Sequence, residues 1–215
     1  MARAESICGV ILAAGASSRM GRDKALLPWP PLQPRELAVT ETFLSAAIQA
    51  LSPYTDLVVV VAGANEPNLL PVIYSNAAFL VRNPDPDRGQ FSSLQVGLQE
   101  VMNRGRDSAL VTLVDRPPVQ AHTIETLRAA FDDSSTDTWA VVPQFGGKHG
   151  HPALFTRELI GCFLEAPATA NAREIEHQQQ RHILYVPVDD PYVTANIDTP
   201  EDYAALQRGV PPAAP

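Results

Sequence analysis

Short, apolar, β-branched segments alternate with amphipathic helical patterns along the whole chain. The expected strands cover residues 7–13, 57–62, 79–81, 109–114, 139–142 and 183–186. Between them, apolar side chains recur every three or four residues, as in the stretches 43–51, 94–102 and 124–131. Buried parallel strands separated by crossover helices produce this pattern. The sequence therefore predicts a three-layer α/β/α fold around a doubly wound, mostly parallel sheet.

Length and charge narrow the class of protein. The chain has 215 residues, 45% of them hydrophobic, and a formal net charge of −8. We expect one domain over residues 1–208 and a disordered Pro/Ala tail over 209–215. The acidic balance argues against nucleic acid as a partner. Apolar runs fall far short of the roughly 20 residues that span a membrane, so no membrane partner is expected.

The two cysteines, Cys8 and Cys162, lie among apolar neighbours. Two such residues cannot build a disulfide scaffold, and reduced thiols of this kind are typical of the cytoplasm. We therefore expect a cytoplasmic protein.

Polar clusters follow three of the expected strands, after Ala13, after Val81 and at Asp115. Ligands of doubly wound sheets bind outside the carboxyl ends of the strands, so the site is expected there. The first cluster is a glycine loop, residues 13–24, which concentrates Arg19, Arg22 and Lys24 in an acidic chain. Backbone N–H groups and these cations suit a polyphosphate. The spacing of its glycines fits neither a dinucleotide fingerprint nor a P-loop.

Residues 12–28, which read LAAGASSRMGRDKALLP, resemble the glycine-loop motif of the sugar-phosphate-type nucleotidyltransferases. Within that group they resemble the branch of the molybdenum cofactor cytidylyltransferases and guanylyltransferases. The resemblance implies a Rossmann-like nucleotidyltransferase fold and extends over about residues 7–207. It implies base and ribose contacts for Leu12, Ala13, Ala14 and Gly15. It implies that Arg19 and Lys24 bind the triphosphate, whereas Arg22 is expected to be a solvated surface residue.

A carboxylate ends the expected strand 109–114. Asp115 at such a place suits Mg²⁺, which binds one or two carboxylates together with phosphate oxygens. The resemblance also assigns the metal to Asp115, although Val114 stands where the family usually has glycine. Residues 193–203 resemble the family's closing motif, in which the first polar position completes the metal site. Asn196 and Asp198 are both candidates, and the sequence leaves the choice open.

Residues 82–98 resemble the cytidylyltransferase branch, with the pattern NP…GxxSSLxxGL. The resemblance implies that Ser93, together with Ser92, binds the nucleotide, and it favours CTP over GTP. The same serines have the spacing of a helix capping box, which predicts a helix beginning near Ser92. A second helix start is predicted at Thr199-Pro200.

Residues 142–155 resemble the family segment that lies beside the acceptor substrate. Gly150, His151 and Pro152 are accordingly expected to bind the acceptor. His149 and His151 alone could suggest a metal, but no third ligand follows nearby. Lys148 either pairs with an acceptor phosphate or is solvated surface.

The resemblance implies nucleotidyl transfer, with Arg19, Lys24 and Asp115 as the catalytic set and Mg²⁺ as the cofactor. The expected acceptor is a phosphorylated small molecule, molybdopterin above all, and the expected protein partner is a molybdoenzyme or its maturation chaperone. Three alternatives remain open: a guanylyltransferase of the same cofactor, a transferase for a sugar phosphate or another acceptor, and a nucleotide-binding regulator without turnover.

Overall fold

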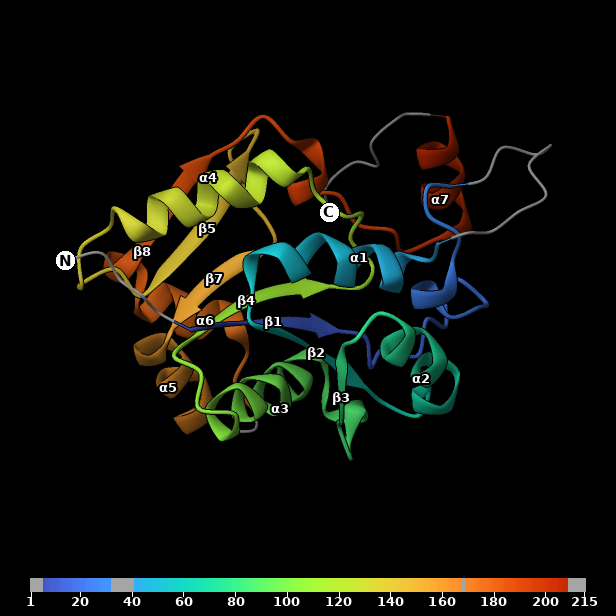
Figure 1. Ribbon diagram of the computed structural model, residues 1–215, viewed down its shortest axis with the longest axis horizontal. Helices are drawn as coiled ribbons and strands as arrows, with labels where there is room; N and C mark the ends of the chain where they lie inside the picture. Colours follow the sequence, from blue (N-terminus) through green and yellow to red (C-terminus); the bar gives the residue numbers. More distant parts are fainter. Residues whose placement is uncertain (1–5, 32–40, 168, 209–215) are drawn as a thin grey trace.

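A single sheet organises the part of the chain that the computed structural model describes, residues 6–31, 41–167 and 169–208 (Figure 1). Its eight described strands have the order β3-β2-β1-β4-β7-β5-β6, and β8 pairs with β5. They are β1 (Ile7–Leu12), β2 (Leu57–Ala62), β3 (Phe79–Arg82), β4 (Ser108–Leu113), β5 (Ala140–Phe145), β6 (Lys148–His149), β7 (Ala153–Thr156) and β8 (Ile183–Pro187). The expected tail, 209–215, lies outside the described residues.

The sheet is mixed but mostly parallel, as the sequence predicts. Strand β1 pairs in parallel with β2 and β4, β2 with β3, and β5 with β8. Strand β7 runs antiparallel to both β4 and β5, and the short β6 runs antiparallel to β5. Because β7 reverses direction between them, β5 points the same way as β4. Strands β6 and β7, which were not predicted, lie within the segment that is expected beside the acceptor.

Helices cover both faces of the sheet. They are α1 (Phe43–Leu51), α2 (Glu66–Ser75), α3 (Gln90–Asn103), α4 (Ala121–Asp132), α5 (Arg157–Glu165), α6 (Ala172–Gln178) and α7 (Pro200–Gln207). Alternate residues of β1 separate two apolar cores: Ile7 and Ile11 join one with α1, α2 and α4, and Cys8 and Val10 join the other with α3, α5 and α6. Figure 1 shows α1 and α4 on one side of β1 and α3 on the other. This is the predicted three-layer arrangement.

One predicted helix start is wrong and the other is confirmed. Helix α3 begins at Gln90 after Gly89, whose φ of +93° favours glycine, so Ser92 lies inside the first turn and does not cap the helix. At α7, the Thr199 side chain accepts a hydrogen bond from the Asp202 backbone, and the Asp202 side chain completes a capping box. The Ser92 hydroxyl instead donates to the Gly89 carbonyl oxygen at 2.7 Å.

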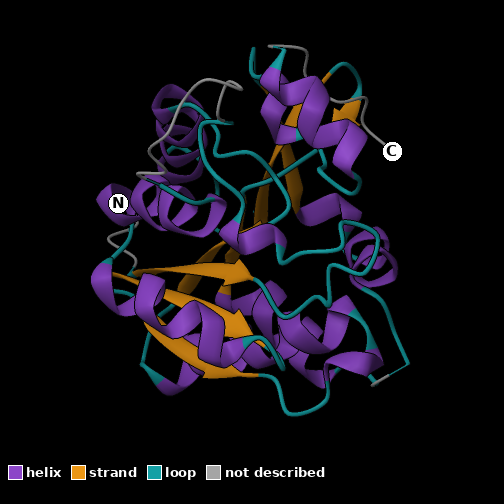
Figure 2. Cartoon of the chain, turned by 90° about the vertical axis from the view of Figure 1, so that its right-hand side faces the viewer, coloured by secondary structure: helices purple, strands orange, loops and turns teal. Residues whose placement is uncertain are grey.

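The parallel strands end at one edge of the sheet, where the predicted polar clusters meet. Figure 2 shows this edge with its loops in front of the strands. Backbone bonds hold two of the loops against their neighbours: the Ala13 N–H donates to Val61 O at 2.8 Å, and the Val114 N–H donates to Leu12 O at 3.1 Å. No helix in the described ranges is long and apolar enough to cross a membrane.

Candidate active site

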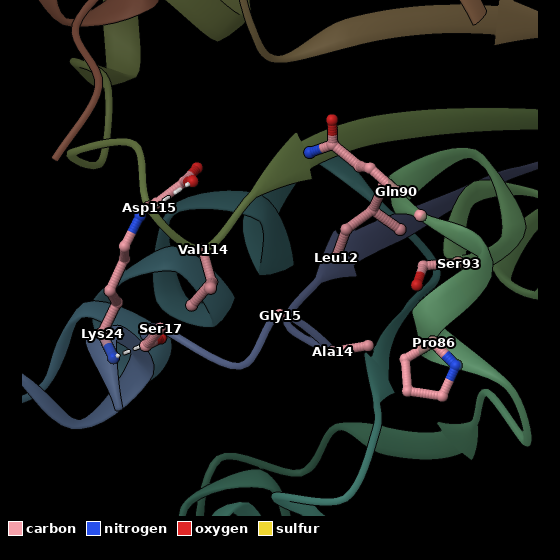
Figure 3. Close-up of a pocket in the computed structure, with 11 residues that line it drawn as sticks. Leu12, Ala14, Gly15, Ser17, Lys24, Pro86, Gln90, Ser93, Val114 and Asp115 are labelled. Atoms are coloured by element: carbon pink, nitrogen blue, oxygen red, sulfur yellow. Dashed lines mark hydrogen bonds and ion pairs between the residues drawn. The ribbon is translucent and has the colours of Figure 1, made fainter. Parts of the chain in front are cut away.

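A pocket of about 280 Å³ lies between the glycine loop, the end of β4 and the start of α3 (Figure 3). Its lining residues are Leu12, Ala14, Gly15, Ser17, Lys24, Pro86, Gly89, Gln90, Ser93, Val114 and Asp115. In Figure 3, Lys24 and Asp115 lie on one side of Gly15, and Ser93 and Pro86 lie on the other. The pocket therefore has a charged end and an end lined by α3 and the loop before it.

The charged end is built around Lys24, the first residue of a short 3₁₀ helix (Lys24–Leu26). Asp23 caps this turn by accepting from the Ala25 N–H. The Asn65 amide holds Asp23 in place, because it donates to Asp23 Oδ2 at 2.8 Å and to Ala13 O at 2.9 Å. The backbone that carries Lys24 is thus fixed to the end of β1.

The Lys24 side chain is buried and reaches two carboxylates. Its Nζ lies 2.6 Å from Asp198 Oδ1 and 3.4 Å from Asp115 Oδ2. Arg19, which is largely exposed, approaches the same Asp198 oxygen at 3.2 Å. Two cations therefore meet two carboxylates at one point, and the point adjoins the pocket.

Two acceptor oxygens at this point are buried and have no hydrogen-bond partner among the described residues. They are Asp115 Oδ1 and Asn196 Oδ1. The Asn196 amide nitrogen donates instead to Asp198 Oδ2 at 2.8 Å. Buried oxygens without a donor are costly unless a ligand satisfies them, and hard cations such as Mg²⁺ prefer carboxylate and amide oxygens.

The donor set fits a cation that brings other ligands with it. Within the described ranges, no three His, Cys, Asp or Glu side chains are grouped so that they could hold a metal. One carboxylate oxygen and one amide oxygen are nevertheless free, and Mg²⁺ commonly takes its remaining ligands from water and phosphate. The residues present therefore fit a metal that is bound together with a nucleotide.

The other end of the pocket contains a buried hydrogen-bond relay. The Asn83 amide donates to Ser92 Oγ and to Ser93 Oγ, both at 2.9 Å. Its orientation is fixed because Asn83 Oδ1 accepts from the Asp85 N–H. Ser92 passes its own hydrogen to Gly89 O at 2.7 Å, whereas Ser93 is only an acceptor in the described structure. The Ser93 hydroxyl is therefore set to donate into the pocket.

A second, larger cavity of about 920 Å³ adjoins the first and shares Leu12, Gly89 and Gln90 with it. It is lined by β6, the loop after it, α6 and β8, and by Arg116 beside the metal-ligating candidate Asp115. Molecules bound in the two cavities would meet at the shared residues. This geometry suits a reaction between two substrates.

The expected acceptor residues lie on this cavity in part. Gly150 and His151 line it, whereas Pro152 is buried and is not part of the lining. A Cβ at Gly150 would overlap the Val193 carbonyl group, and the His151 N–H donates to that same oxygen at 2.8 Å. Burial, together with the charge of the nearby Arg116, lowers the pKa of His151 to about 4. His151 is therefore neutral at physiological pH.

Arg116 was not singled out in the sequence. Its guanidinium donates to Ala195 O at 3.0 Å and to Val193 O at 3.4 Å, and its buried Nε has no partner among the described residues. Burial lowers the Arg116 pKa, and Asp115 and Asp198 oppose that shift. Its place directly after the strand-end carboxylate was the available signal.

Most of the predicted nucleotide residues share one pocket. Leu12, Ala14, Gly15, Lys24, Ser93 and Asp115 line it. Ala13 and Ser92 are buried behind the lining, and Arg19 reaches the site only through Asp198. Gln90 lines both cavities and was missed, because a glutamine at a helix start carries no distinctive pattern.

Two joined cavities at the carboxyl edge of a Rossmann-like sheet, with Lys24 and Asp115 at the charged end of one of them, suit a nucleotidyltransferase. A family model described as a MobA-like NTP transferase domain matches residues 9–183. The chain belongs to this family.

Named relatives agree with that assignment. The chain is 26% identical over 201 residues to the molybdenum cofactor cytidylyltransferase of Escherichia coli K12, covering 93% of this chain and 94% of the relative. It is 27% identical over 210 residues to a probable molybdenum cofactor guanylyltransferase of Mycobacterium avium, covering 97% and 98%.

Solved structures show the same fold. The crystal structure of Rv0371c from Mycobacterium tuberculosis H37Rv superposes with a TM-score of 0.77 at 24% identity, covering 95% of this chain and 100% of that one. A second structure of that protein is described as a complex with manganese.

Proposed function

We propose that this nucleotidyltransferase moves CMP from CTP to the phosphate of molybdopterin, with Mg²⁺ as cofactor and pyrophosphate as the second product. The observation that carries the proposal is the position of Lys24. Its ammonium group joins Asp115 and Asp198 at the charged end of the smaller pocket, beside the cavity that would hold the acceptor.

The metal would be held by Asp115 and completed by Asn196. Both residues have a buried oxygen without a donor, whereas both Asp198 oxygens already have partners in Lys24, Arg19 and Asn196. This difference favours Asn196 over Asp198 as the second ligand. A bound divalent ion would neutralise charge on the nucleotide phosphates. The manganese complex of Rv0371c supports a divalent cation in this fold.

Asp198 would then act as a positioning residue. It holds the Lys24 ammonium and the Arg19 guanidinium at one carboxylate oxygen, in the loop that leads into α7. Both cations are thereby aimed at the region of the triphosphate. Lys24 and Arg19 would stabilise the charge that develops as the bond between the α-phosphorus and the leaving pyrophosphate breaks.

The acceptor needs no general base. A phosphate oxygen that is already ionised attacks the α-phosphorus, the new phosphoanhydride bond forms, and pyrophosphate carries away the displaced electron pair. His151, neutral and half-buried, is suited to shaping the acceptor cavity and not to carrying charge. Catalysis is then alignment and electrostatic stabilisation, as expected for phosphoryl chemistry.

The choice of CTP rests on the similarity of residues 82–98 to the cytidylyltransferase branch, and this segment contains the relay from Asn83 to Ser93. Because Asn83 donates to Ser93, the Ser93 hydroxyl can offer its hydrogen to a carbonyl oxygen or ring nitrogen of the base. Cytosine presents two adjacent acceptors, O2 and N3, on one edge. The 26% identity with a cytidylyltransferase fits this choice, while the 27% identity with a probable guanylyltransferase makes GTP the alternative to be tested.

The same proposal includes the cellular location of the enzyme and the protein that receives its product. We place the reaction in the cytoplasm, consistent with two free cysteines, Cys8 and Cys162. The product would pass to a molybdoenzyme or its maturation chaperone.

The test is pyrophosphate release with Mg²⁺ and each of the four NTPs, with and without molybdopterin. Release with CTP that requires molybdopterin supports the proposal. Faster release with GTP would make the protein a guanylyltransferase, and release only with another phosphorylated acceptor would replace molybdopterin. Binding of an NTP without any release would indicate a regulator without turnover.

A further inference from the structure

The larger cavity holds a carboxyl group that the transfer mechanism does not use. Glu176 lies on α6, faces this cavity and is half-buried. Its carboxyl group has no hydrogen-bond or ion-pair partner among the described residues. Burial, opposed in part by the charge of Arg173 one turn earlier on α6, raises its pKa from 4.5 to about 7.

Aromatic rings from two strands line the same cavity. The His149 ring of β6 stacks on the Tyr185 ring of β8, with ring centroids 3.9 Å apart and planes within 14°. Glu176 lines the same cavity as Tyr185, and burial together with the charge of Glu176 raises the pKa of Tyr185. An unpaired acceptor and a flat aromatic pair therefore face one space.

This part of the cavity is separate from the phosphate chemistry. The charged groups at the metal end are Lys24, Asp115 and Arg116, and none of the described hydrogen bonds or ion pairs joins Glu176 to them. Glu176 is the one carboxylate among the described residues that line this cavity, whereas the cations of the lining, Arg88, Arg116, Lys148 and Arg173, come from four separate segments. A substrate that fills it needs a phosphate on one part and a planar group with N–H donors on another.

We propose that Glu176, with the stacked pair His149 and Tyr185, forms a subsite for a planar 2-amino-4-oxopyrimidine ring of the acceptor. A carboxylate accepts two parallel hydrogen bonds from the ring N–H and the 2-amino group, and the aromatic pair packs against the ring face. This inference rests on the proposed function, since it names how the acceptor's ring is recognised.

The matched ligands for the test are pterin and lumazine. Pterin carries the 2-amino group, and lumazine has an oxygen there, which would face the carboxylate with an acceptor. Binding is measured by calorimetry at pH 8, where Glu176 is ionised. The wild-type protein should bind pterin at least about tenfold more tightly than lumazine, as expected for losing a charge-assisted hydrogen bond. Equal affinities, or no measurable pterin binding, would overturn the proposal.

Two variants of α6 separate recognition from folding. Glu176→Gln should lower pterin affinity about tenfold and remove the preference over lumazine. Glu174→Gln changes an exposed glutamate on the same helix that does not line this cavity, and it should bind pterin like the wild type. CTP affinity should be the same in all three proteins. A pterin preference that survives in Glu176→Gln would also overturn the subsite.

The outcomes distinguish this inference from the proposed function. A pterin preference that depends on Glu176, without pyrophosphate release from any NTP, supports the subsite and overturns the transfer reaction. Transfer to molybdopterin with the same acceptor KM in the wild type and in Glu176→Gln supports the reaction and overturns the subsite. The ligand pair also tests the wild-type protein directly, so the result stands even if a variant does not fold.

Discussion

The Lys24 ammonium nitrogen lies 2.6 Å from Asp198 Oδ1, although 174 residues separate them in the chain. This contact connects the glycine loop at the start of the chain to the loop that enters α7. It also means that a metal bound at Asp115 and Asn196 would have the lysine as an immediate neighbour.

Replacing Lys24 should therefore affect chemistry and metal binding in opposite directions. In Lys24→Ala, loss of a charge that stabilises the transition state should lower kcat about 100- to 1,000-fold. Mn²⁺ should bind at least as tightly as in the wild type, because the ammonium no longer competes with the ion for the Asp115 carboxylate. Pyrophosphate release and Mn²⁺ electron paramagnetic resonance measure the two effects.

Arg22→Ala is the control for this experiment. Arg22 is an exposed cation of the same loop that lies over the Tyr203 ring, 5.6 Å from its centroid, and it does not line the pocket. This variant should keep normal kcat. A folded Lys24→Ala protein with wild-type kcat would contradict the proposed role.

The second metal ligand can be decided with two alanine variants. Asn196→Ala should weaken Mn²⁺ binding, because it removes a buried oxygen that has no other partner. Asp198→Ala should instead raise the KM for the nucleotide, because it releases Lys24 and Arg19. Asp115→Ala should lose metal binding and about 100- to 1,000-fold in kcat. Tight Mn²⁺ binding in Asn196→Ala together with lost binding in Asp198→Ala would reverse the assignment.

Neighbouring serines provide a matched pair for base recognition. Ser93→Ala should raise the KM for CTP about 5- to 15-fold, the effect of one lost hydrogen bond, and should also cost about 1 kcal/mol of stability because Asn83 loses an acceptor. Ser92→Ala should leave the KM near normal but destabilise the fold by about 1 kcal/mol, lowering Tm by about 2–4 °C. The difference arises because Ser92 donates to Gly89 O and Ser93 does not donate within the described structure. Equal KM values for the two variants would remove Ser93 from base recognition.

The parallel part of the sheet was predictable because its strands are continuous β-branched runs such as Leu57–Ala62. Strands β6 and β7 escaped prediction because they have two and four residues and flank a Gly-His-Pro turn, which gives no periodic pattern. The β7 residues are nevertheless all buried, since they fill the space between β4 and β5. Their position is a tertiary effect that local patterns do not carry.

The residues of the site could be predicted from the sequence, but the contacts between them could not. Sequence spacing and resemblance indicated Lys24 and Asp115 separately, and their approach depends on β1 lying beside β4. Asn83 was not foreseen as a hydrogen-bond donor, because an Asn-Pro pair indicates a turn as readily as a buried relay. Glu176 gave no signal at all, since a glutamate on a polar helix is usually solvated. Only the position of α6 at the wall of the larger cavity distinguishes Glu176 from a solvated glutamate.

A methyl group at Gly150 should disturb the acceptor wall. Its Cβ would overlap the Val193 carbonyl, to which the His151 N–H is bonded. We expect Gly150→Ala to lose about 1–3 kcal/mol of stability and to raise the acceptor KM. Gly161→Ala is the control, because no described atom outside its helix environment lies within 4 Å of the added Cβ, and alanine favours the helix by about 1 kcal/mol. Thermal melting of both variants checks this prediction, and an unchanged Tm in Gly150→Ala would contradict it.

Glu176 should also make stability depend on pH. Its pKa in the folded protein, about 7, lies above the ordinary 4.5, so the folded state holds its proton more tightly than the unfolded state. Stability is then fully present below about pH 4.5 and falls as pH rises towards 7. Glu176→Gln removes this loss and should melt higher than the wild type at pH 8 but not at pH 4. Because solvent reaches the cavity, an effect on the order of 1 kcal/mol, or about 2–4 °C, is expected.

Glu174→Gln should not show this gain, because Glu174 is exposed in the first turn of the same helix. Loss of its favourable interaction with the helix dipole would lower Tm slightly at pH 8, in the opposite direction. The other ionisable side chains that line the cavity near Glu176, among them Arg173, His177, Lys148, His149 and Tyr185, are unchanged in every protein compared, so they do not account for a difference between the proteins. A Glu176→Gln variant that melts no higher than the wild type at pH 8 would show that this carboxyl group is ordinarily solvated.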